Sequence, residues 1–265
     1  MKRTGYNSEA QNKMFSYRNG LIDQMYRTQE VLKGVADPNV ASALKGWHEH
    51  IGQVLLDSFD ALAPPPNVDT TASDQARATA LWNVVGVATA DFDAGGTPDN
   101  TSRFMMYIAW HEGAALKYRV QQPNGPALSF FQIQGASAQT AYNSSSMTDD
   151  RLITLASYTG SSHDAIVAGF QALTSSASFP DGNLIATLLQ QSDIFGAYVA
   201  RALLWSFPAA LPQPALPPVA LYQPQADYWF QYWHGGVGEA DTLKQQFKND
   251  CAAVDPLLPP PPISI

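Results

Sequence analysis

Clusters of proline divide this chain into segments, and this division restricts the possible folds more than any other feature of the sequence. One cluster is Ala63–Pro66, prolines recur through residues 207–226, and Asp255–Ile265 is also rich in proline. Because proline lacks a backbone N–H and restricts the residue before it, helices end at such clusters. Between the clusters apolar residues recur at helical spacing, and no convincing strand is longer than four residues. The sequence therefore predicts a mostly α fold.

The proline clusters also predict how the chain is divided into parts. Within the first part, helices are expected over about 14–33 and 40–62, with a turn at Asp37-Pro38 between them. The proline-rich stretch that follows is expected to be a stiff linker. The predicted parts are an N-terminal helical hairpin (1–62), a linker (63–74), a main domain (75–251) and a proline-rich C-terminal tail (252–265).

The main domain is expected to consist of helices around one polar loop. That loop, residues 121–145, is rich in Gly, Pro, Ser, Gln and Asn. Capping residues are expected before three of the helices: Asp99 or Asn100, Thr148, and Ser162. The predicted helices cover residues 75–90, 101–116, 149–158, 163–174, 184–206, 226–233 and 239–251.

Composition excludes several classes of protein. Only 14% of the residues are charged while 45% are hydrophobic, so a large core can form and general disorder is excluded. The net charge of −8 argues against nucleic acid or an anionic membrane surface as partner. No apolar run reaches the roughly 20 residues of a membrane span, and the polar start predicts no signal peptide. With Cys251 as the single cysteine, an intramolecular disulfide and a Cys-rich zinc site are excluded.

Glu112 is the best candidate for a catalytic side chain. Phe104, Ile108 and Glu112 follow each other at intervals of four and therefore share one helix face. A carboxyl on an apolar face is partly desolvated, which favours its neutral form and lets it act as a general acid. The alternative is a glutamate in the last helical turn whose side chain extends into water.

Other kinds of chemistry have weaker support in the sequence. The histidines lack the spacing of a metal site, no Gly-x-Ser-x-Gly nucleophile motif occurs, and neither a phosphate-binding nor a dinucleotide-binding loop is present. Cys251, near the end of the last helix, is best interpreted as a small buried apolar residue. We therefore expect neither a metal nor another cofactor.

The stretch after Glu112 resembles the lysozyme-like muramidases and lytic transglycosylases, in particular those of bacteriophage particles. The resemblance covers roughly residues 76–250 and continues at Asp193–Ala197 and at the Trp/Tyr-rich segment Asp227–Trp233. Its central motif is a helix-borne Glu, a Gly-containing loop and an aromatic-Gln segment, here Trp110-His111-Glu112-Gly113 followed by Gly125-Pro126-Ala127-Leu128-Ser129-Phe130-Phe131-Gln132-Ile133.

The resemblance implies a fold, an activity and a set of site residues. It implies a lysozyme-like helical domain that cleaves the β-1,4 bond between N-acetylmuramic acid and N-acetylglucosamine in peptidoglycan, by hydrolysis or by transglycosylation. Glu112 would be the general acid and base. No second catalytic carboxylate is identifiable, and Asp149, Asp150, Asp193 and Asp227 stay open. The sugar groove would be lined by Ser129, Phe131, Gln132 and Tyr142, and also by Trp229 and Tyr232 unless these two fill the core.

The resemblance also implies a setting for the protein. Without a signal peptide, a phage virion or an injection device would carry it to the bacterial cell wall, and residues 14–62 and 255–265 would dock it to other particle proteins. The alternative is a structural or adaptor component of such a particle that has kept the scaffold and lost catalysis. Ser129-Phe130, in place of the family's usual pair of a small residue and glycine, and the missing second acid favour that alternative. A toxin injected into rival bacteria would share the chemistry and differ only in its delivery.

Overall fold

The computed structural model describes residues 27–28, 31–47, 49, 64–93, 98–212 and 222–260. The contacts divide the chain into two compact units, Met1–Pro64 and Pro65–Ile265. The second unit therefore begins N-terminal to residue 75, the predicted start of the main domain. In the part of the chain that the structure describes, no helix is long and apolar enough to cross a membrane.

In the first unit, residues 31–32 and 38–47 are helical. Asp37 caps the second of these segments, because its Oδ1 accepts hydrogen bonds from the backbone N–H groups of Asn39 (2.8 Å) and Val40 (3.4 Å). Pro38 occupies the first helical position, where its missing N–H removes no hydrogen bond. Most of the two predicted hairpin helices, 14–33 and 40–62, lies outside the described residues.

The second unit is built from helices, which confirms the mostly α prediction. Between Val120 and Ile133 there are only isolated β-bridges, Val120 with Leu128 and Leu128 with Ile133. A π-helical turn, Trp229–Trp233, and a 3₁₀ turn, Asp255–Leu257, follow two of the helices. The helices are α3 (Asp74–Phe92), α4 (Pro98–Glu112), α5 (Gly135–Asn143), α6 (Asp149–Thr159), α7 (His163–Gln171), α8 (Leu184–Gln191), α9 (Asp193–Ser206), α10 (Gln223–Tyr228) and α11 (Ala240–Val254).

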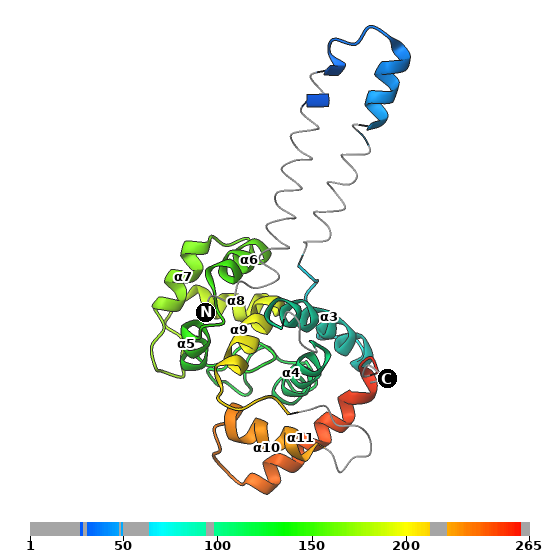
Figure 1. Cartoon of the computed structure of the whole chain (residues 1–265). Coiled ribbons are helices and arrows are strands. Elements are labelled where there is room, and N and C mark those ends of the chain that lie inside the picture. Colours follow the sequence, from blue (N-terminus) through cyan, green and yellow to red (C-terminus); the bar gives the residue numbers. More distant parts are fainter. Residues whose placement is uncertain are drawn as a thin grey trace. The chain divides into compact units, whose positions relative to one another are not determined.

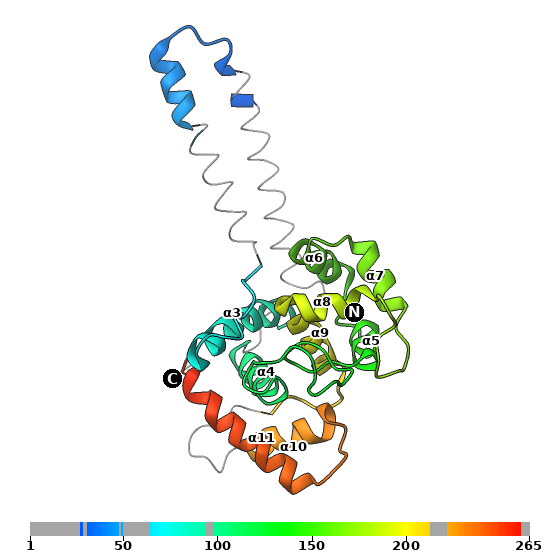
Figure 2. The ribbon, with the colours of Figure 1, turned by 180° about the vertical axis from the view of Figure 1, so that it is seen from behind.

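Helix α9 is the centre of the second unit. Every residue from Asp193 to Leu204 is buried, as expected for a helix that is apolar on almost all of its faces. It packs against α3, α5, α6 and α8, and α3 also packs against α4 (Figure 1). Helices α10 and α11 lie together beyond α4, away from α5, α6 and α7, in both views (Figure 2). Glu112, the last residue of α4, therefore lies where α4 meets α11 and the segment after α10.

Three predictions for the main domain need correction. The predicted helix 184–206 is two helices, because Ser192 leaves helical geometry (φ −133°, ψ 108°) and its Oγ accepts from the N–H of Phe195 (3.3 Å). Helix α4 begins at Pro98, before the expected caps Asp99 and Asn100, since proline is tolerated in a first turn. The predicted loop 121–145 contains α5, which is rich in small residues.

The C-terminal segment is bound to the helices instead of forming a free tail. Residues 252–254 complete α11, and Leu258 is buried. Asp255 accepts hydrogen bonds from the Arg103 guanidinium and from the Tyr107 hydroxyl (2.6 Å to the hydroxyl). The C=O of Leu257 accepts from Gln75 Nε2 (2.9 Å). Residues 255–258 therefore hold α3 and α4 together, and 261–265 lie outside the described residues.

Candidate functional site

Glu112 ends α4 with its carboxyl among aromatic side chains and is only partly exposed. Trp229 Nε1 donates a hydrogen bond to Glu112 Oε1 at 2.9 Å. Burial raises the pKa of Glu112; His111, the Trp229 N–H and His234 each act to lower this pKa, and burial outweighs them. The geometry therefore favours a carboxyl that keeps its proton at higher pH than an exposed glutamate does.

The indole of Trp229 is fixed by rings from three segments. It stacks on Phe247 of α11 (centroids 4.8 Å apart, 14° between planes) and meets His111 edge-on (4.7 Å) and His234 at a tilt (5.0 Å). The π-helical turn contributes, because the N–H of His234 donates to the Trp229 C=O five residues earlier (2.8 Å). Such turns are frequent at functional sites. Here the turn brings Trp229 and His234 close together beside Glu112.

The backbone reverses direction immediately after Glu112. Ala114, Ala115 and Leu116 have φ of 48°, 58° and 61°, the left-handed region that costs residues other than glycine roughly 1 kcal/mol or more each. Gly113 permits this reversal by its small size, since a Cβ there would lie 2.7 Å from the Ala109 C=O oxygen and 3.2 Å from Phe130. The glycine at this position is therefore explained by the close approach of the following loop.

That loop is a small closed turn. The backbone N–H groups of Leu128 and Ile133 donate to each other's C=O, at 2.9 and 2.8 Å. Between them Ser129 and Gln132 have left-handed φ values of 63° and 49°. Ser129 Oγ accepts from the N–H of Phe131 (3.1 Å), and Ser129 O accepts from Gln132 Nε2 (3.0 Å). Side-chain as well as backbone hydrogen bonds therefore hold this turn in one conformation.

Three of the predicted sugar-binding side chains are buried. Ser129, Phe131 and Trp229 each expose only 1% of their surface. Ser129 packs on α9, where a Cβ on Gly196 would lie 3.0 Å from Ser129 Cβ. These residues therefore support the site from within the core, and Trp229 donates a hydrogen bond to the Glu112 carboxyl instead of presenting a face to a sugar.

The other three predicted residues are partly exposed but do not form one cluster. Tyr142 stacks on Phe170 (4.9 Å, 7°) in the α5–α7 region, while Tyr232 stacks on Phe207 (5.8 Å, 28°) after α10. Gln132 Oε1 is buried and has no hydrogen-bond partner among the described residues. Of these three, only Gln132 belongs to the turn that packs on Gly113, next to Glu112.

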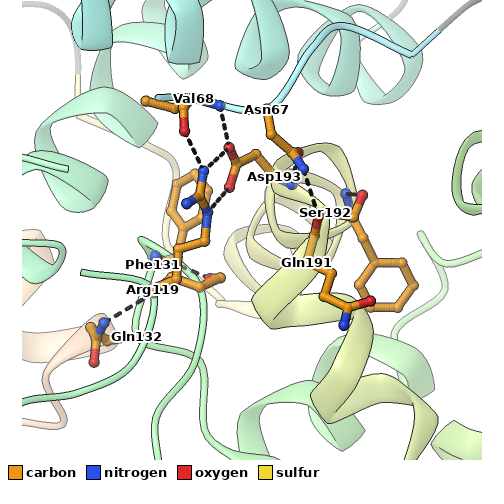
Figure 3. Close-up of polar contacts among 10 residues, drawn as sticks. Asn67, Val68, Arg119, Phe131, Gln132, Gln191, Ser192 and Asp193 are labelled. Carbon is orange, nitrogen blue, oxygen red and sulfur yellow. Dashed lines mark hydrogen bonds and ion pairs between the residues drawn. The ribbon is translucent and has the colours of Figure 1, made fainter. Parts of the chain in front are cut away.

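Arg119 fastens the base of this loop, and the sequence did not single it out. Its guanidinium forms two hydrogen bonds to Asp193, from Nε to Oδ1 and from an amino group to Oδ2, both 2.7 Å long (Figure 3). It also donates to the Val68 C=O (2.7 Å) and lies 4.4 Å from the Phe130 ring centroid. Asp193 in turn accepts from the Val68 N–H (2.7 Å). Val68, which lies in the segment predicted as a linker, thus contacts both α9 and the loop.

The four candidates for a second carboxylate have other partners or lie at a helix start. Asp193 is paired with Arg119, and Asp227 forms a 2.7 Å ion pair with Lys244. Asp149 and Asp150 are exposed in the first turn of α6, where their negative charges interact favourably with the helix dipole. Glu112 is therefore the carboxyl whose environment best suits proton transfer.

Metal and thiol chemistry find no support in the described residues. No group of three or more His, Cys, Asp or Glu side chains there could hold a metal ion. Cys251 is buried, and burial raises the pKa of its thiol well above the ordinary value. A protonated, inaccessible thiol is a poor nucleophile.

Comparison with known proteins adds no relative from which a role could be transferred. No protein-family model matches the chain, and no curated protein or solved structure gives a match.

Proposed function

We propose that the second unit cleaves the glycan of peptidoglycan at the β-1,4 bond between N-acetylmuramic acid and N-acetylglucosamine, with Glu112 as general acid and base. The observation that carries this proposal is the environment of Glu112: a carboxyl at a helix end, its pKa raised by burial, one oxygen held by an indole N–H. The resemblance of residues 110–133 to lysozyme-like enzymes gives the substrate class.

In this proposal Glu112 first gives up a proton and then takes up another. The neutral carboxyl first protonates the glycosidic oxygen as its bond to the anomeric carbon breaks. The resulting carboxylate then accepts a proton from water or from a hydroxyl of the sugar, whose oxygen forms the new bond to the anomeric carbon. The Trp229 N–H holds Oε1 throughout and stabilises the carboxylate more than the acid, because hydrogen bonds to charged groups are the stronger ones. Positioned acid–base catalysis of this kind contributes typically ~10²–10⁴-fold to the rate.

A phage virion or an injection device is the proposed carrier, with residues 14–62 and 255–265 as docking segments. Because the segment from Asp255 to Pro259 is engaged by α3 and α4, the part of the tail available for docking begins after Pro259. A chain that lacks residues 261–265 should fold normally and lose incorporation into particles; unchanged incorporation would contradict the role of the tail.

The second candidate function is a structural component of such a particle without catalysis. The burial of Ser129, Phe131 and Trp229 favours it, since these side chains were expected to contact the sugar. In that case Glu112 would be a partly buried acid with no substrate.

Clearing of purified peptidoglycan by the wild type, Glu112→Gln and Glu239→Gln decides between the two. Glu239 is an exposed glutamate before α11 and serves as the matched control. The enzyme requires clearing by wild type and Glu239→Gln and a loss of roughly 100-fold or more in Glu112→Gln. No clearing by any of them supports the structural component. The mass of the released fragments separates hydrolysis from transglycosylation.

A further inference from the structure

Next to Glu112, His111 forms a hydrogen bond that the proposed reaction does not yet use. His111 Nδ1 donates to Asp250 Oδ2 of α11 at 2.6 Å. The His111 side chain is 16% exposed and that of Asp250 is 40% exposed, so the pair lies at the edge of the site. A carboxylate oxygen accepts only, so an ionised Asp250 fixes the proton of His111 on Nδ1 and orients the ring.

The oriented imidazole is one of three aromatic rings that are all in contact with one another. His111 meets Trp229 at 4.7 Å and Phe247 at 5.3 Å, both edge-on, and Trp229 stacks on Phe247 at 4.8 Å. Phe247 and Asp250 are three residues apart on α11 and so lie on one face of that helix. Each ring thus contacts the other two, and a change at His111 reaches the indole that holds Glu112.

We propose that Asp250 and His111 are positioning residues for Glu112: Asp250 holds the imidazole, and the imidazole fixes the Trp229 indole so that its N–H meets Glu112 Oε1. The His111 ring held in this way also favours the carboxylate that Glu112 becomes after it has given up its proton. This inference rests on the proposed function for its catalytic meaning, but the coupling between the four side chains can be measured without any substrate.

Among the described residues, three titratable groups bear on the Glu112 carboxyl in this proposal. His111 lies beside Glu112 on α4, His234 follows the π-helical turn, and Asp250 reaches the site from α11. His111 and His234 both act on Glu112 in the direction that favours its ionised form. Removing the charge of Asp250 without any positioning effect would itself favour ionisation of Glu112, whereas a lost orientation of His111 opposes it. The direct effect of the Asp250 charge and the loss of His111 therefore predict opposite signs for Asp250→Asn, and the coupling between His111 and Trp229 separates positioning from a mere loss of charge on the imidazole.

The experiment is a ¹³C NMR titration of the glutamate side-chain carboxyls in the full chain. The signals are few, since the glutamates are Glu9, Glu30, Glu49, Glu112 and Glu239. Loss of one signal in Glu112→Gln assigns it. We expect the midpoint of Glu112 to move to higher pH in His111→Asn, in Asp250→Asn and in Trp229→Phe. We also expect the His111→Asn shift to shrink in the Trp229→Phe background, because the imidazole acts partly through the indole.

Matched controls separate positioning from loss of fold. Asp227→Asn breaks an ion pair between α10 and α11 without touching His111, and His163→Asn removes a histidine at the start of α7; neither should move the Glu112 midpoint. Dispersed NMR spectra show that each variant folds, and His111→Gln replaces His111→Asn if the latter does not.

Two results overturn the inference: a Glu112 midpoint that falls or stays constant in Asp250→Asn, or His111 and Trp229 shifts that add without coupling. Failure to clear peptidoglycan by the wild type would refute the proposed function instead, and would leave the titration result standing.

Discussion

Replacing Arg119 by methionine tests how the loop behind Glu112 is held. The substitution keeps an apolar stem over Phe130 and leaves the Asp193 carboxylate, 1% exposed, with the Val68 N–H as its remaining described donor. Removing one partner of a buried ion pair costs ~3–5 kcal/mol. Because the Arg119 side chain is 20% exposed, we expect the lower end, about 3 kcal/mol. For a domain of this size each kcal/mol lowers Tm by ~2–4 °C, so Tm should fall by roughly 6–12 °C.

The assay is thermal and denaturant unfolding of Arg119→Met, Asp193→Asn and the double variant. Because Asp193→Asn removes the uncompensated charge, the double variant should lose less stability than the sum of the single losses, with a coupling energy of roughly 1–3 kcal/mol. Lys244→Met, which breaks a more exposed pair with Asp227, should cost under about 1 kcal/mol. A loss below about 1 kcal/mol in Arg119→Met, or strict additivity with Asp193→Asn, would refute the reasoning.

Three further outcomes follow from the same structure. Burial raises the pKa of Glu112 in the folded state, so the wild type loses stability as pH rises from about 4.3, the ordinary glutamate value, through the folded pKa. Glu112→Gln should therefore become more stable than the wild type over that range. At pH 3 the two proteins should unfold at the same urea concentration. Gly196→Ala should lower stability by ~1–3 kcal/mol through its 3.0 Å approach to Ser129, and equal urea midpoints would contradict that packing. Phe247→Ala should cost ~3–5 kcal/mol and weaken any peptidoglycan clearing, whereas full clearing would show that the ring set does not hold Trp229.

The helices were largely predictable because their signal is local. Apolar spacing places α3 close to its observed bounds, and the capping residue Ser162 places the start of α7. The break before α9 was missed because apolar residues continue on both sides of Ser192, so only its backbone geometry and cap reveal it. Helix α5 was missed because its Gly, Ser and Asn residues are also typical of loops.

Only the part of the candidate site that lies on a single helix face was predictable from the sequence. The spacing of Phe104, Ile108 and Glu112 singled out a carboxyl on an apolar helix face, and burial does raise its pKa. Its partners come from distant segments: Trp229 lies 117 positions from Glu112 and Asp250 lies 139 positions from His111. No local pattern in the sequence encodes such distances. The sequence alone therefore does not distinguish an aromatic residue that binds a sugar from one that is buried and holds the Glu112 carboxyl.

The attachment of Asp255 to α4 has a consequence for synthesis of the protein. Tyr107 and Asp255 are separated by 148 positions, so α4 emerges from the ribosome long before the carboxylate that it binds. At about 5–20 residues per second, this delay amounts to roughly 7–30 s. During that interval Arg103 and Tyr107 must remain without their final acceptor, and the nascent chain stays open to chaperones and proteases until residues near 255 have been translated.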